Sequence, residues 1–75
     1  MPRVIRCFDK VDDSCVDEVS LDVQLVLLQE LFGVDADNPM YDCYPVGKAE
    51  ESFFEKCSEI SFDFDRFEYF LEYDA

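Results

Sequence analysis

Two short runs of β-forming residues open the chain, and a turn separates them. Residues 3–8 (Arg-Val-Ile-Arg-Cys-Phe) are rich in β-branched and aromatic side chains, which favour a strand. Residues 11–14 (Val-Asp-Asp-Ser) supply turn formers, and residues 15–19 return as a second short strand. The pattern therefore predicts a β-hairpin at the start of the sequence.

Apolar residues in the next segment recur with the spacing of an α-helix. The stripe that they form contains Leu21, Leu25, Leu28 and Phe32. Ser20 suits an N-cap, Asp22 would lie in the first turn, where the helix dipole favours an anion, and Gly33 follows at the usual C′ position. We expect a helix over residues 21–32 whose wide apolar face packs across a sheet.

An acidic loop and an extended segment follow this helix. Residues 35–39 (Asp-Ala-Asp-Asn-Pro) favour a loop, because Pro39 lacks a backbone donor and disfavours helical geometry at Asn38. Residues 40–46 favour an extended conformation such as a short edge strand, where Pro45 is tolerated, and Gly47 ends this segment.

The remaining residues predict a second helix and a final strand. A helix is expected over residues 48–60, with Glu50 and Glu51 in its first turns. Its apolar face would contain Phe53, Phe54, Cys57 and Ile60. Beyond it, aromatic residues alternate with carboxylates, and the alternation changes phase near residues 65–66, which indicates a bend or bulge. A strand over residues 66–73 follows, although Phe64, Phe67, Phe70 and Leu71 also fit a helical spacing.

The order β-β-α-(β)-α-β predicts an α+β fold. It corresponds to a small, mostly antiparallel sheet with two helices packed on one face. With a length of 75 residues, the chain is expected to form a single domain over residues 1–75. A hydrophobic content of 49%, with 8 Phe and 4 Tyr, is too high for an acidic disordered tail.

The charge of the chain narrows its possible partners. There are 19 Asp and Glu against 6 Lys and Arg, with no His, for a net charge of −13. The first ten residues carry +2, which leaves −15 on the others. Phosphates would repel such a chain, so direct binding to nucleic acid or to an anionic membrane is not expected. No membrane-spanning run or signal peptide is evident, and a cytoplasmic location is predicted.

The four cysteines are expected to be small, mostly buried apolar residues. Cys7, Cys15, Cys43 and Cys57 form no C-x-x-C pair, and His is absent, so a zinc site is not expected. Two disulfides in any of three pairings remain an alternative, which a reducing cytosol disfavours.

Carboxylates are the remaining candidates for catalysis or metal binding. Asp35 with Asp37 and Asp63 with Asp65 are the closest pairs in sequence, and solvated surface is the favoured interpretation of both. Residues 35–38 resemble the start of a calcium loop, but Pro39 occupies the fifth position, Met40 the sixth and Val46 the twelfth. Without His there is no Ser-His or Cys-His dyad. We therefore expect no enzyme activity, no catalytic residue, no metal site and no cofactor.

A protein-binding surface is the best remaining candidate. Tyr41 and Tyr44 lie among Asp35, Asp37 and Asp42, and tyrosine often anchors interfaces because a large apolar ring carries a polar tip. For Tyr41 we favour the interface. Tyr44 is also a candidate binding residue, although packing into the core is slightly favoured for its ring. A second candidate set contains Asp63, Asp65 and Glu68.

Phe70 shares the face of Glu68 and Glu72 if the last strand forms. We expect this face to lie beside the N-terminal strand, where Arg3 or Arg6 would pair with the glutamates.

An acidic surface with aromatic anchors suits a partner whose own site is basic, such as a nuclease toxin. Three segments, Phe32-Gly33-Val34, residues 39–45 and residues 69–75, resemble small bacterial proteins similar in size and acidity to immunity proteins of colicin, pyocin and contact-dependent growth inhibition systems. The resemblance implies a cytosolic protein that is not an enzyme and that binds the toxin domain of its own system. It carries no binding residues across, because known immunity families have unrelated folds.

Our leading hypothesis is an immunity protein that neutralises a cognate basic toxin, which we expect to be a nuclease, by masking its active site or substrate-binding surface. One alternative is a phage-type nucleic-acid mimic that inhibits a host nuclease. Another is an acidic interaction subunit with no inhibitory role.

Overall fold

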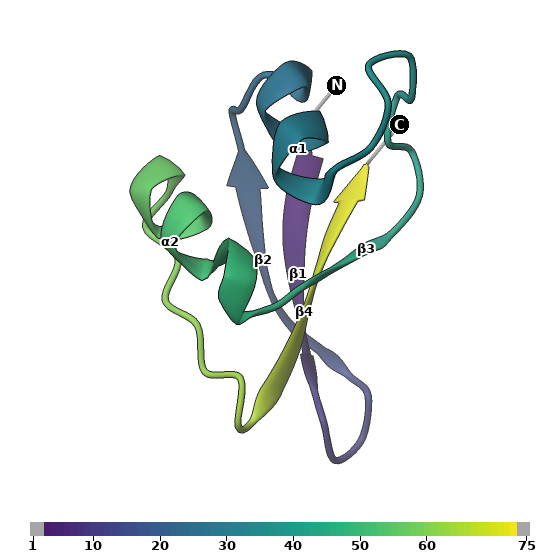
Figure 1. Ribbon diagram of the computed structural model, residues 1–75. Helices are drawn as coiled ribbons and strands as arrows, with labels where there is room; N and C mark the ends of the chain where they lie inside the picture. Colours follow the sequence, from purple (N-terminus) through teal and green to yellow (C-terminus); the bar gives the residue numbers. More distant parts are fainter. Residues whose placement is uncertain (1–2, 74–75) are drawn as a thin grey trace.

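Four antiparallel strands form one sheet in the computed structural model, which describes residues 3–73 (Figure 1). The strands are β1 (Arg3–Asp9), β2 (Cys15–Leu21), β3 (Tyr44–Val46) and β4 (Phe67–Tyr73). Their order across the sheet is β2-β1-β4-β3. Helices α1 (Leu25–Phe32) and α2 (Lys48–Cys57) cover the same face of the sheet (Figure 1). The predicted α+β fold, with its antiparallel sheet and two helices, is confirmed.

The side chains that face the helices form the core. Ile5 and Cys7 of β1 alternate with residues on the other face, and Tyr69 and Leu71 of β4 do the same. The buried cluster contains Ile5, Cys7, Leu21, Leu28, Met40, Val46, Phe54, Tyr69 and Leu71. Each helix contributes one fully buried side chain, Leu28 from α1 and Phe54 from α2. Around them, Leu25, Leu31 and Phe32 of α1 and Phe53 of α2 are partly buried against the same cluster.

The first helix begins later than the sequence predicts. β2 continues to Leu21, which lies opposite Arg3, so Ser20 is a strand residue opposite Val4 rather than an N-cap. Pairing with β1 and burial of Leu21 outweigh the local capping preference of Ser20. Asp22 consequently lies before the helix, whose N-cap is Gln24.

The C-terminal boundaries of both helices have clear local causes. Gly33 has φ 67° and ends α1, as its position predicts, because glycine adopts this left-handed conformation without strain. α2 ends at Cys57, not at Ile60. The backbone N–H and the hydroxyl of Ser58 both donate to the Phe54 carbonyl oxygen, at 3.1 and 2.9 Å, and Ser58 is already extended.

The last segment of the described chain is a strand. The Asp63 carbonyl accepts hydrogen bonds from the N–H groups of Arg66 and Phe67, and this turn produces the predicted change of phase before β4. β3 is shorter than residues 40–46 and lies at the sheet edge, where Pro45 is opposite Phe70. Residues 69–75 form one of the three segments that resemble immunity proteins, and the last two of them, Asp74 and Ala75, lie outside the described residues.

The prediction that all four cysteines are mostly buried is wrong for three of them. Only Cys7, on the core face of β1, is buried, and Cys15, Cys43 and Cys57 are exposed. Cys15 begins the edge strand β2, Cys43 precedes the edge strand β3, and Cys57 is the last residue of α2. All four are free thiols.

Candidate partner-binding surface

Buried polar side chains hold the loop between α1 and β3. Gln29, which is 5% exposed, donates from Nε2 to the carbonyl oxygens of Ala36 and Asn38, at 3.0 and 2.7 Å. The Asn38 side chain in turn accepts a hydrogen bond from the backbone N–H of Met40, at 2.9 Å. Met40 is fully buried although its φ is 55°, so the loop is anchored into the core at this point.

Arg3 fixes the same loop to β1. Its guanidinium nitrogens donate to the carbonyl oxygens of Met40 and Pro39, both at 2.8 Å, and the residue is 9% exposed. The guanidinium carbon lies 5.0 Å from the centre of the Tyr73 ring, which adds a cation–π contact. This buried charge is therefore stabilised by two backbone dipoles and an aromatic face.

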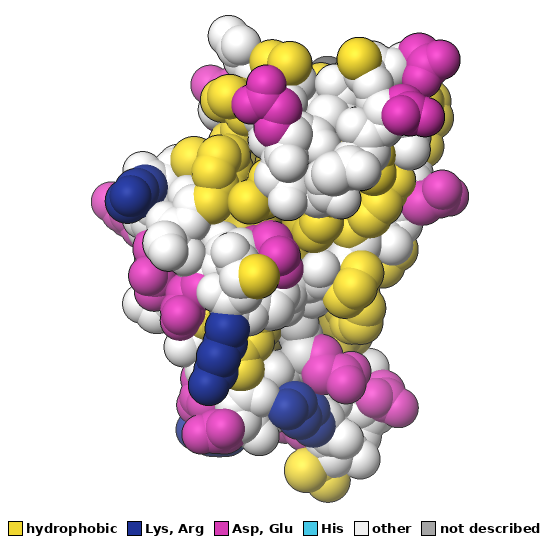
Figure 2. Space-filling model, in the orientation of Figure 1, with side chains coloured by type: hydrophobic (Ala, Val, Ile, Leu, Met, Phe, Trp, Pro, Cys, Tyr) yellow, Lys and Arg dark blue, Asp and Glu magenta, His cyan; other side chains and the backbone are white. Residues whose placement is uncertain are grey.

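These contacts support an exposed acidic surface with one aromatic ring, which we call the loop surface and define as Asp35, Asp37, Tyr41 and Asp42. All four residues are exposed, and Tyr41 retains 62% of its accessible area. Figure 2 shows carboxylates over the part of the molecule that this loop occupies in Figure 1, while the visible Lys and Arg side chains lie around α2 and below it. Four of the eight predicted binding residues thus come from one loop that these hydrogen bonds anchor to the core.

Tyr44 does not belong to the loop surface. It is half-buried, its ring lies 5.5 Å from that of Phe32, and it packs against the core. The structure therefore places Tyr44 in the packing position that we favoured for it.

The second predicted set lies at the other end of the sheet. Asp63 and Asp65 belong to the segment that leads into the start of β4, whereas Tyr41 contacts Tyr73 at the end of this strand. Glu68 is exposed on the face without helices, opposite Phe8. The two sets thus do not form one continuous surface.

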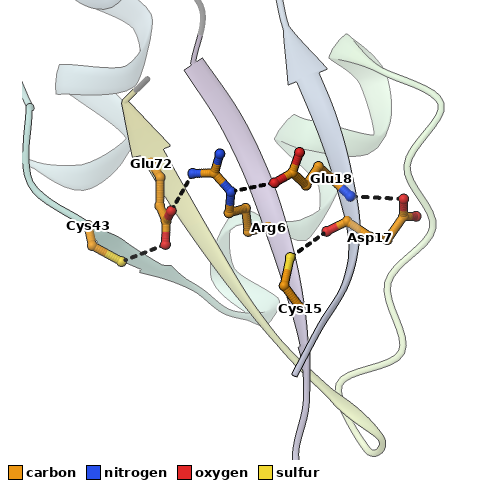
Figure 3. Close-up of polar contacts among 6 residues, drawn as sticks. All are labelled: Arg6, Cys15, Asp17, Glu18, Cys43 and Glu72. Atoms are coloured by element: carbon orange, nitrogen blue, oxygen red, sulfur yellow. Dashed lines mark hydrogen bonds and ion pairs between the residues drawn. The ribbon is translucent and has the colours of Figure 1, made fainter. Parts of the chain in front are cut away.

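The face of the sheet without helices carries an ion-pair network (Figure 3). Arg6 contacts Glu18 at 2.7 Å and Glu72 at 2.6 Å, and the Cys43 thiol donates to the other oxygen of Glu72 at 3.4 Å. Phe70 lies opposite Arg6 in β1, with its ring 5.7 Å from that of Phe8. Of the two arginines expected to pair with the glutamates of the last strand, Arg6 pairs with Glu72, whereas Arg3 binds the loop between α1 and β3.

The comparison with known proteins adds a family. A family model described as a domain of unknown function (DUF7683) matches residues 2–72. The chain belongs to the DUF7683 family. No curated protein and no solved structure matches the chain. In this DUF7683 domain, the matched range contains both helices and all four strands except Tyr73, the last residue of β4.

Two other kinds of site, a metal site and a reactive thiol, place their own requirements on the side chains of the domain. Over residues 3–73 there is no group of three or more Cys, Asp or Glu residues positioned to hold a metal ion. Desolvation raises the pKa of the Cys43 thiol, and its hydrogen bond to Glu72 raises it further. Burial raises the pKa of the Cys7 thiol and of the Tyr69 hydroxyl.

Neither helix within the described range has the length and apolar character to cross a membrane.

Sequence reasoning missed the residues that support the loop surface. Tyr73 shares the alternation of Tyr69 and Leu71, which indicated its face but not its contact with Tyr41. The sequence predicts Arg3 only as an alternative to Arg6 for pairing with Glu68 or Glu72. Its role depends on the approach of a loop 36 residues away, for which the sequence contains no signal.

Proposed function

We propose that this DUF7683 protein is a non-catalytic binding protein that neutralises a basic partner, in the manner of an immunity protein against a nuclease toxin. The observation that supports this proposal is the loop surface, where one loop exposes the ring of Tyr41 together with the carboxylates of Asp35, Asp37 and Asp42. In this role the protein acts in the cytoplasm, where the toxin's nucleic-acid substrate is found.

Charge complementarity explains how such a surface would work. A nuclease holds phosphates in a cationic cleft, and carboxylates placed there exclude the substrate and accelerate association. Tyr41 supplies exposed apolar area, as interface anchors commonly do. Because Gln29 and Arg3 already hold the loop, little conformational entropy is lost on binding.

The arrangement favours an anchored binder over a nucleic-acid mimic. A mimic would present carboxylates in a row along an exposed face, like phosphates along a strand. The loop surface instead has three carboxylates and one aromatic ring on a single loop, and Asp63 and Asp65 precede the start of β4, whereas Tyr41 contacts Tyr73 at its end.

Co-expression with the reading frame adjacent to the gene tests the proposal. We expect rescue of growth when that frame encodes a toxic nuclease. The triple reversal Asp35→Lys, Asp37→Lys and Asp42→Lys is expected to abolish rescue and to slow association with the purified toxin at least about tenfold at low salt.

The matched control makes the same change of charge elsewhere. It reverses three carboxylates on the two helices, Glu30, Glu51 and Glu55. We expect this control to retain rescue. Equal loss in both triple variants would show that net charge alone matters, and unchanged rescue in the loop variant would eliminate the loop surface.

A further inference from the structure

The sheet has one long edge that no strand covers within residues 3–73. β3 forms one edge, but it has only three residues and contains Pro45, which cannot donate a hydrogen bond. β2 forms the other edge with seven residues and no proline. Alternate residues of an edge strand direct their N–H and C=O groups away from the sheet, where another extended chain can pair with them.

A groove lies beside this edge. It has a volume of about 450 Å³, within the range of ligand pockets, and it separates β1 and β2 from residues 59–63. Its apolar lining includes Val16, Val19, Ile60 and Phe67. Cys7 of β1 pairs with Asp17, and the next residue, Phe8, pairs with Cys15. Val16 therefore has no partner in β1 and forms a β-bulge. Val16 and its neighbour Asp17 therefore both line the groove.

The charged residues around the groove all have one sign. Asp17, Glu59 and Asp63 line it, and none of the described residues that line it is Lys or Arg. A second copy of this chain, with a net charge of −13, would be repelled. Charge complementarity therefore selects a basic occupant.

One backbone donor on this edge is covered by a side chain that can be displaced. The Asp17 carboxylate accepts the backbone N–H of Glu18 at 2.9 Å, on the side of β2 away from β1 (Figure 3). An incoming strand could supply a carbonyl to this N–H. The Asp17 carboxylate would then be available to pair with a basic side chain.

We propose that β2 and the adjacent groove bind an extended, basic segment of a partner protein, which adds to the sheet beside β2. Its carbonyl oxygen accepts the Glu18 N–H, a Lys or Arg contacts Asp17, and an apolar side chain contacts Val16 and Val19. The inference goes beyond the proposed neutralising role, because it concerns another surface and requires no inhibition.

A nine-residue peptide of alternating Lys and Val, added to the isotope-labelled full chain, is the direct probe. We expect amide chemical shifts to change in β2 and in residues 59–63, and the Glu18 amide to become protected from hydrogen exchange. A peptide with Glu in place of Lys, and one N-methylated at alternate amides, should bind at least tenfold more weakly. Absence of binding, equal binding of the N-methylated peptide, or shifts confined to residues 35–42 would overturn the proposal.

Single variants separate binding from mere protection of the edge. Asp17→Asn keeps a side-chain acceptor for Glu18 but loses the charge, and should weaken binding about two- to fivefold. Glu55→Gln, an exposed control of equal charge change on α2, should leave affinity unchanged. Tighter binding of both the Lys and the Glu peptide to Asp17→Ala would show that Asp17 only blocks the edge, and would overturn the proposal. The outcome of the co-expression test of the loop surface does not depend on the outcome of this peptide-binding test of the β2 edge.

Discussion

The ring of Tyr41 lies against the ring of Tyr73, with their centroids 4.5 Å apart and an angle of 34° between their planes. Tyr73 belongs to β4 and is also contacted by the Arg3 guanidinium, so an exposed loop residue rests on a fixed part of the sheet. This contact orients the one large exposed ring of the loop surface without burying it.

Replacement of Tyr41 should separate stability from binding. Because the side chain is 62% exposed, Tyr41→Ala should lower the free energy of unfolding by only about 0.5–1.5 kcal/mol, the range of an aromatic pair. Tyr41→Phe should preserve stability. Urea denaturation measures both variants. A loss above about 3 kcal/mol for Tyr41→Ala would mean that the ring is a core residue and not a surface anchor.

Removal of the Arg3 guanidinium should loosen the loop. Arg3→Met leaves the carbonyl oxygens of Pro39 and Met40 without their donor and should lower the free energy of unfolding by about 1.5–3 kcal/mol. Arg66→Met, which removes an exposed guanidinium above Phe67, is the control and should change stability by less than about 1 kcal/mol. Equal effects of the two variants in urea denaturation would contradict the anchoring role of Arg3.

Double-mutant cycles should rank the two ion pairs of Arg6. The Glu72 side chain is 24% exposed and that of Glu18 is 55% exposed, so solvent screens the second pair more strongly. We expect a coupling energy near 1 kcal/mol for Arg6→Met with Glu72→Gln, and a few tenths for Arg6→Met with Glu18→Gln. The reverse order would show that exposure does not decide the strength of these pairs.

Salt should stabilise the fold. At a net charge of −13, repulsion among carboxylates opposes folding, and the Debye length falls from about 30 Å at 0.01 M to about 8 Å at 0.15 M ionic strength. The melting temperature should therefore rise between these two sodium chloride concentrations. The triple reversal at Asp35, Asp37 and Asp42 serves as control, since reducing the net charge should shrink the rise. A melting temperature that falls with salt would indicate that ion pairs outweigh repulsion.

The cysteines should react with a maleimide in a defined order at neutral pH. Cys57 is exposed and should be labelled before Cys43, whose pKa is raised by desolvation and by Glu72, so that less of it is thiolate. Cys7 is buried with a raised pKa and should be labelled last. Peptide mass spectrometry after timed quenching gives the order. Glu72→Gln should speed the labelling of Cys43, and an unchanged rate would exclude Glu72 as its cause.

Local sequence signals predicted the elements where the signal is itself the physical cause. Gly33 ends α1 because it can adopt a left-handed conformation, and Pro45 marks an edge because it lacks a donor. The change of phase near residues 65–66 corresponds to a real turn. The predicted start of α1 was wrong, because Ser20 has a local preference for an N-cap but pairs with Val4 across the hairpin.

The sequence by itself determined the α+β order of elements, the acidic charge and the presence of Tyr41 among aspartates. Those properties follow from local conformational preferences and from counting charges. Only the tertiary structure decided that Tyr41 rests on Tyr73 at the end of β4, that Arg3 holds the loop, and that Asp63 precedes the other end of this strand. It also placed Asp17 beside a groove at an open edge. Such relationships depend on strand order and register, which are set by the packing of distant residues.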